Sequence, residues 1–264
     1  MVRFRQNFVW CGLLFCPLAV QAQRGDPFGG FNSYPQFRNL SGLSGSGYGV
    51  DIQGYRSLSG PVAFSTPVAH TLGRGQVQIG GGAMGFDSTL QYQGSKSNGS
   101  SYLTLGATAG RLNVAGTFFI KSGSFDQVYN AQIQYIPDEG TKWVFSLGAQ
   151  DIEGRGGAAG EALPEDQLSS QSFFGVLTYR WDTGRNPIYV SAGFGTRRYG
   201  RMFGSISHQV FKPLRVWAEA DGYSLNYGVT GAWRLAPGRR GLEVSTTLGM
   251  IRGQYLAWSL GVGF

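Results

Sequence analysis

The segment Tyr255-Leu-Ala-Trp-Ser-Leu-Gly-Val-Gly-Phe264 decides the fold class of this 264-residue chain. Large apolar residues occupy every second position, and small or polar residues lie between them. The apolar positions are Leu256, Trp258, Leu260, Val262 and Phe264. Because successive side chains of a β-strand point to opposite faces, this alternation predicts a strand with one apolar face and one polar face. One face suits lipid, and the other suits the lumen of a barrel.

Similar segments recur from residue 76 onward, separated by turn residues. We predict an all-β chain that forms a closed antiparallel transmembrane β-barrel of about 12 strands, within a range of roughly 10 to 14. The segment 201–211 alternates poorly, and an error there would change the count. The predicted strands are 76–86, 100–109, 112–121, 127–136, 141–151, 170–181, 187–197, 201–211, 213–220, 223–235, 241–251 and 255–264.

Three hairpins test the assignment of faces. Directly opposed residues in a hairpin point to the same face, so the length of each loop fixes which residues can pair. With a two-residue Asp-Gly turn and two other short loops, all three hairpins place apolar residues opposite apolar residues. The expected pairs are Ala218 with Leu225 across Asp221-Gly222, Met250 with Leu256 across 252–254, and Ala109 with Leu112 across Gly110-Arg111.

The connections and the aromatic residues favour a membrane barrel over a soluble β protein, which would show the same alternation. The two longest connections, 87–99 and 152–169, both follow odd-numbered strands and fall on one side, as in outer-membrane barrels. Aromatic residues at the other strand ends predict a periplasmic girdle. Its members are Tyr135, Trp143, Trp181, Trp233 and Phe264. The terminal Phe264 resembles the signal that delivers such proteins to the barrel-assembly machinery, and outer-membrane lipid and lipopolysaccharide are the other expected partners.

The N-terminus predicts export. Arg3 and Arg5 precede an apolar run that ends in Val20-Gln21-Ala22, which indicates a signal peptide over residues 1–22. Residues 23–59 are rich in Gly, Ser and Pro without periodicity, so we expect a flexible periplasmic segment before a barrel domain over 60–264. The expected localisation is the outer membrane of a Gram-negative cell.

Composition limits the function classes. Glycine accounts for 43 of 264 residues, and charged residues make up only 14% of the chain. Without Arg3 and Arg5 the chain keeps 20 basic and 15 acidic residues, a net charge of +5 without a dense basic block, so we expect no nucleic-acid partner. Both cysteines lie within residues 1–22, which leaves the mature chain without a disulfide.

The sequence offers little for catalysis. His70 and His208 are its two histidines, so we expect no multi-histidine metal site and no cofactor. His208 lies near Ser205 and Ser207, which leaves a barrel hydrolase as a remote alternative. We therefore predict that the protein is not an enzyme.

Charged and aromatic residues on the polar parity of their strands are the candidate lumen residues. Such side chains could fill and stiffen a narrow barrel, or line a path for a polar or sugar-like substrate. The candidates are Lys121, Arg180, Arg197, Arg215, Trp217, Glu219, Arg234 and Glu243.

Two segments resemble the YjbH-type outer-membrane proteins associated with exopolysaccharide production. The first is Gly60-Pro-Val-Ala-Phe-Ser-Thr-Pro-Val-Ala69, followed by Gly75, and the second is Glu219-Ala-Asp-Gly-Tyr-Ser-Leu-Asn-Tyr-Gly228. Members of that family are much longer, so this chain would correspond to one barrel unit. The resemblance implies a role in exporting or anchoring surface polysaccharide, with polysaccharide export components as partners, and supplies no catalytic residues.

Three function classes stay open on the sequence alone: a component of polysaccharide export or assembly, a general porin-like channel or structural barrel, and the remote hydrolase. The sequence also leaves open whether the lumen conducts or is plugged by residues 23–59, and which oligomeric state the protein adopts.

Overall fold

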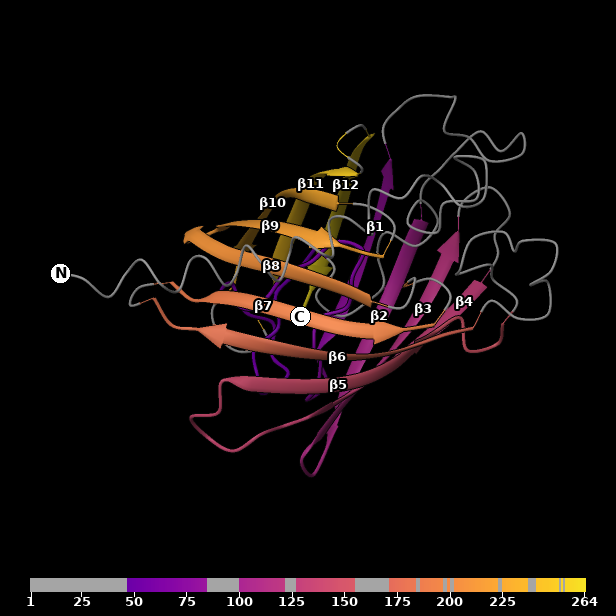
Figure 1. The fold of residues 1–264 in the computed structure, drawn as a ribbon, viewed down its shortest axis with the longest axis vertical. Helices are drawn as coiled ribbons and strands as arrows, with labels where there is room; N and C mark the ends of the chain where they lie inside the picture. The colour runs from indigo at the N-terminus through magenta and orange to yellow at the C-terminus, as the bar shows by residue number, and fades with distance from the viewer. Residues whose placement is uncertain are drawn as a thin grey trace.

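Twelve antiparallel strands make up the computed structural model of the chain (Figure 1). It describes residues 47–84, 100–121, 127–154, 171–183, 186–196, 199, 202–222, 225–236, 241–251, 253 and 255–264. Among these residues, no helix is long and apolar enough to cross a membrane. The strands are β1 (Val77–Met84), β2 (Ser100–Ala109), β3 (Leu112–Lys121), β4 (Gln127–Tyr135), β5 (Trp143–Gln150), β6 (Ser172–Trp181), β7 (Ile188–Gly195), β8 (Met202–Phe211), β9 (Leu214–Ala220), β10 (Leu225–Arg234), β11 (Glu243–Ile251) and β12 (Tyr255–Gly263).

The sheet closes on itself. Each strand pairs with its sequence neighbours, and β1 pairs with β12 from Gln78 opposite Gly263 to Met84 opposite Ala257. Two hydrogen bonds between the main chains of Val77 and Phe264 extend this seam, with N···O distances of 2.8 and 3.0 Å. A closed sheet leaves no edge strand, which is the condition for a β structure to stand in hydrocarbon. The predicted fold class and strand number are confirmed.

Two of the three predicted hairpin registers are confirmed, and the third is shifted. Met250 lies opposite Leu256, and Ala109 lies opposite Leu112, as expected. Across the third hairpin, however, Leu225 pairs with Ala220 rather than with Ala218. The chain does not turn over Asp221-Gly222 alone, because the connection occupies all of residues 221–224. Alternation fixes only odd or even spacing, so a shift of two keeps every side chain on its expected face.

Strand β8, which the sequence left uncertain, is present. It pairs with β7 along Met202 to His208, and its register with β9 shifts between Gln209 and Phe211. Its pattern is poor because the large apolar Phe203 lies on the lumen side and Gly204 and His208 on the outward parity. A β-bulge near the end of the strand adds one extra residue there.

Residues 47–73 fill the interior of the barrel and are here called the plug. All residues from Gly60 to Gly73 are buried, and the indigo trace of this segment runs within the ring of strands (Figure 1). Residues 47–59, which belong to the segment expected to be flexible, contact the lumen wall, as Ile52 and Arg56 do. Residues 1–46, which include the expected signal peptide, lie outside the described part of the chain, as do most of the two long connections.

Candidate functional site

The exterior of the barrel carries a continuous apolar surface. Large apolar side chains from β2, β5, β6, β11 and β12 are each about half exposed, among them Leu105, Leu147, Phe173, Leu248 and Leu260. A soluble protein rarely exposes so large an apolar surface, whereas a membrane barrel needs one against lipid. The protein is an outer-membrane β-barrel.

The five predicted girdle aromatics lie on this exterior, at the strand ends joined by the short connections. The exposed fractions of Tyr135, Trp143, Trp233 and Phe264 lie between 45% and 51%, and Trp181 is partly exposed. This end of the barrel, where β2–β3, β4–β5, β6–β7, β8–β9 and β10–β11 connect, is here called the short-turn end.

The lumen wall consists mainly of uncharged polar side chains. Pairs of hydroxyl groups on neighbouring strands lie 2.9 Å apart, as between Thr178 and Ser191 and between Thr230 and Thr247. Gln132 donates to Ser146 across 2.8 Å. Hydroxyls and amides of the wall bond to one another, and some of them, such as Gln132 and Thr178, also bind the main chain of the plug.

The carboxylate of Glu219 holds the innermost turn of the plug. The main-chain N–H groups of Phe64, Ser65 and Thr66 donate to its oxygens over 2.9–3.1 Å. The hydroxyls of Ser65 and Thr66 donate to the same carboxylate over 2.6 and 3.0 Å. Glu219 is fully buried, and charge-assisted hydrogen bonds are the stronger class, so this contact fixes the plug firmly. Residues 64–66 with Glu219 are here called the latch.

Two neighbours of Glu219 complete the latch. Asn226 Nδ2 donates to Glu219 over 3.2 Å and to Asp221 over 2.8 Å. It also lies 3.3 Å from the Ser65 hydroxyl. The carboxylate that grips the plug is therefore positioned by β9, β10 and their connection together.

Trp217 supports the latch from the same strand. Its indole stacks on the Phe64 ring, with centroids 5.5 Å apart and planes 9° apart, and its Nε1–H donates to Thr230 over 3.2 Å. A Cβ at Gly228 or Gly249 would lie 2.5 or 2.6 Å from the indole, so these glycines on β10 and β11 make room for it to lie against the wall. The ring of Trp217, a predicted lumen residue, is therefore covered by the plug itself.

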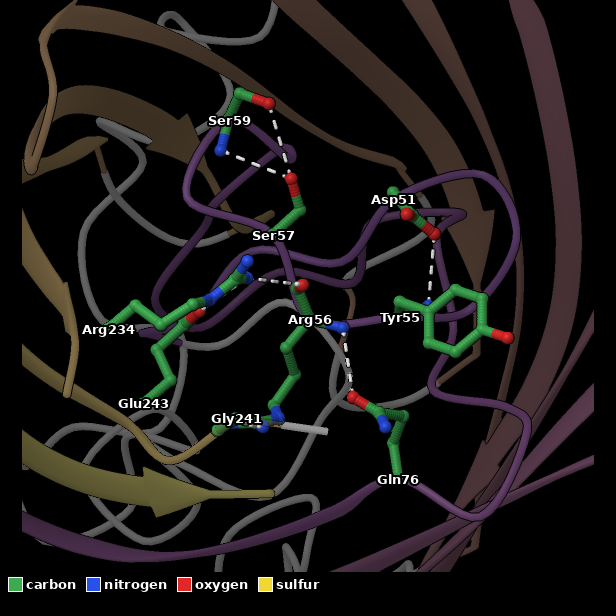
Figure 2. A network of polar contacts seen from close by, with 9 residues as sticks. All are labelled: Asp51, Tyr55, Arg56, Ser57, Ser59, Gln76, Arg234, Gly241 and Glu243. Carbon is green, nitrogen blue, oxygen red and sulfur yellow. Dashed lines mark hydrogen bonds and ion pairs between the residues drawn. The ribbon is translucent and has the colours of Figure 1, made fainter. Parts of the chain in front are cut away.

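A second set of contacts holds the plug near the short-turn end (Figure 2). Arg56 Nη2 donates to the Gly241 carbonyl over 2.8 Å, and Arg234 Nη2 donates to the Arg56 carbonyl over 3.2 Å. Arg234 also pairs with Glu243 over 3.3 Å. Deeper in the lumen, Arg215 Nη1 donates to the Gly60 carbonyl over 2.9 Å.

The opposite wall binds the returning arm of the plug. Gln132 donates to the Val68 carbonyl over 2.7 Å, and Thr178 accepts the Ala69 N–H over 2.9 Å. His70 Nδ1 lies 2.9 Å from the Val50 carbonyl within the plug. Burial lowers the pKa of His70 to about 4, and the charge of Arg180 acts in the same direction. The imidazole is therefore neutral at ordinary pH.

The predicted lumen residues fall into three groups. Arg215, Trp217, Glu219 and Glu243 are buried in the lumen, and Arg234 lies partly buried beside Glu243. Arg180 lies at the short-turn mouth, where it pairs with Asp182 over 2.8 Å. Lys121 ends β3, but its side chain lies outside the described part of the structure, as does Arg197.

The serines and the histidine considered for hydrolysis point to opposite faces. Ser205 and Ser207 are buried on the lumen side of β8, whereas His208 lies on the outward parity opposite Val216. These two serines therefore do not meet His208 as nucleophile and base. Within the described ranges, no three His, Cys, Asp or Glu side chains are grouped to hold a metal ion.

The sequence left open whether residues 23–59 plug the lumen, and it did not show that the plug extends to Gly73, because the segment carries no periodicity. Its contacts run to residues far away in the chain, such as Glu219 and Arg215, and each uses a different side chain. The segments Gly60–Ala69 and Glu219–Gly228, both singled out in the sequence, meet at the latch.

Comparisons with known proteins give no family. No family model matches the chain, and no curated protein does. Among solved structures it is similar to the KdgM porin in complex with disordered oligogalacturonate, at 9% identity and a TM-score of 0.47, over 72% of this chain and 98% of that one. It is also similar to a mutant Rhodopseudomonas blastica porin, at 10% identity and a TM-score of 0.36, over 62% of this chain and 55% of that one.

Proposed function

We propose that the protein acts in the export or assembly of a surface polysaccharide, as a channel-like outer-membrane barrel closed by its own plug. One observation carries the proposal: the two segments that resemble the YjbH-type family are in direct contact at the latch, although more than 150 residues separate Ser65 from Glu219. The resemblance therefore concerns one structural unit rather than two unrelated turns.

The chemistry of the wall supports a polar, uncharged cargo. Side-chain amides and hydroxyls both donate and accept hydrogen bonds, as sugar hydroxyls do. In the present state these groups bind the main chain of the plug, as Gln132 and Thr178 illustrate. If the plug leaves, the same groups are available along the lumen for a carbohydrate chain.

A structural or general porin-like role is the second candidate. The filled lumen favours a structural or anchoring role over a permanently open pore, because the plug is gripped at both ends of its path. Partners in this proposal are polysaccharide export components, together with the barrel-assembly machinery during biogenesis.

The deciding experiment is deletion of the gene in the source bacterium, with measurement of cell-surface polysaccharide. We expect the polymer to fall and to return with the wild-type chain. A Glu219→Leu variant that still reaches the outer membrane should restore it incompletely. Unchanged polymer in the deletion strain would contradict the proposal and leave the structural role.

A further inference from the structure

A cavity of about 360 Å³ lies at the short-turn mouth, between the plug and the wall. Its volume falls at the lower end of the range for small-molecule sites, roughly 300–1,000 Å³. The plug contributes Ile52, Gln53 and His70, the β4–β5 turn contributes Thr141, and β7 contributes Tyr189. The cavity thus has a floor that belongs to the plug and sides that belong to the wall.

Four acidic and two basic residues line the cavity, and most of their charged groups are paired or hydrogen-bonded. Asp182 pairs with Arg180 over 2.8 Å and with Lys142 over 3.4 Å. The Asp51 carboxylate accepts the main-chain N–H groups of Gln53 and Tyr55, each over 2.9 Å. The excess of carboxylates repels an acidic ligand, and the existing pairs weaken the field offered to a small cation, which favours a neutral ligand.

The deep wall of the cavity is suited to a sugar ring. His70 and Tyr189 meet edge to face with centroids 5.7 Å apart, and Ile52 and Val144 add apolar surface. Gln53, Ser57, Ser59 and Thr141 line the same space with uncharged donors and acceptors. Sugar rings present both apolar C–H faces and hydroxyl groups, which this combination of side chains matches.

We propose that this cavity binds a short segment of a neutral polysaccharide at the short-turn mouth of the barrel. The inference rests on the proposed function and names the substrate class and its first point of contact. Because plug and wall both line the cavity, the bound saccharide contacts the segment that must move before the lumen opens. The site therefore lies where a polymer end would first meet the closed channel.

The test uses calorimetric titration of the refolded chain from residue 23 with neutral trisaccharides (maltotriose, cellotriose and laminaritriose) and with trigalacturonate as the acidic comparison. Thr141→Trp fills the cavity from the wall. Thr183→Trp makes the same change in the next turn, outside the cavity lining, and is the matched control. A heat-modifiable gel shift verifies that each variant is folded, and Ser59→Trp fills the cavity from the plug if Thr141→Trp does not fold.

We expect at least one neutral trisaccharide to bind, with affinity about tenfold or more weaker in the filled variant and unchanged in the control. Absence of binding by all three, preference for trigalacturonate, or equal affinity in the filled variant would each overturn the inference. Failure of the proposed function alone has a different signature. The purified chain would still bind a saccharide and lose that binding in Thr141→Trp, whereas the deletion strain would keep all its surface polymer.

Discussion

The wall and the plug of this barrel are stabilised by two different kinds of contact. Each strand of the wall is bonded to both neighbours by a regular ladder of main-chain hydrogen bonds, from β1 through to β12. In the described part of the plug, pairing of that kind is limited to isolated bridges, as between Val50 and Arg56. It is held mostly by individual side chains of the wall, such as Glu219 and Gln132, that bind its main chain.

This difference divides the effects of substitution between the two parts. Removing one side chain from the wall leaves the ladder intact, because the main chain supplies its bonds. Removing one side chain that grips the plug deprives several buried donors at once. The plug should therefore loosen under changes that leave the barrel folded, and four experiments test that separation.

The largest effect is expected from Glu219→Ala. The N–H groups of residues 64–66 lose their acceptor, and each buried unpaired donor costs roughly 1–3 kcal/mol. Single-channel recordings in planar bilayers should show the open fraction rise by about a hundredfold or more. Glu219→Gln keeps one acceptor oxygen, so its open fraction should lie between those of the wild type and Glu219→Ala. A variant as silent as the wild type would mean that the latch does not hold the plug.

Trp217→Ala should follow. It removes the ring that stacks on Phe64 and leaves a void beside Gly228, at a cost of about 3–5 kcal/mol if the site does not collapse. We expect limited proteolysis to cut the plug faster while the heat-modifiable shift persists. Trp217→Phe, which keeps a ring, is the matched control, and equal cleavage in both variants would contradict the role of the stack.

Acid should loosen the plug through His70. Its pKa is about 4 in the docked plug against 6.5 for an exposed imidazole, so the released plug takes up a proton first as pH falls. The stabilisation is complete above pH 6.5 and falls by about 2 kcal/mol by pH 5. Conductance recorded at both pH values should increase in acid, and His70→Gln, which keeps an amide donor, should reduce that dependence. Equal acid responses in both chains would place the effect elsewhere.

The smallest effect is expected from Leu147→Ala on the lipid face. Leu147 is 53% exposed on the barrel and makes its main contact with lipid, so we expect a loss of unfolding free energy of about 1 kcal/mol or less. Urea titration of the refolded barrel measures it. Conductance should match the wild type, and any increase would show that the wall and the plug are not separable.

The wall was predictable because the alternation that places its side chains can be read within each strand alone. Alternation along each strand, as in Tyr255–Gly263, places every side chain on its face without reference to any other strand. The parity of short loops then gave the correct registers around Gly110-Arg111 and 252–254. Alternation cannot distinguish registers that differ by two residues. For that reason the register predicted for the hairpin at Asp221-Gly222 was wrong by two.

The plug was not predictable in this way because its contacts join residues that lie far apart in the sequence. Val62 donates to Ser207, Thr71 to Gln134 and Ser65 to Glu219, and no spacing in the sequence connects the members of these pairs. The lumen list nevertheless contained the main partners of the plug, Arg215, Trp217, Glu219 and Arg234. Strand parity showed that these residues point inward, but only the structure shows what they bind.

The seam between β1 and β12 fixes the circumference of the barrel. The circumference of a ring of twelve bonded strands cannot increase gradually. A wider ring would require all the main-chain hydrogen bonds between two neighbouring strands to break. The width of the lumen is therefore set by the number of strands. If the barrel passes a polymer as proposed, the space that the plug now fills sets the largest cross-section that can pass.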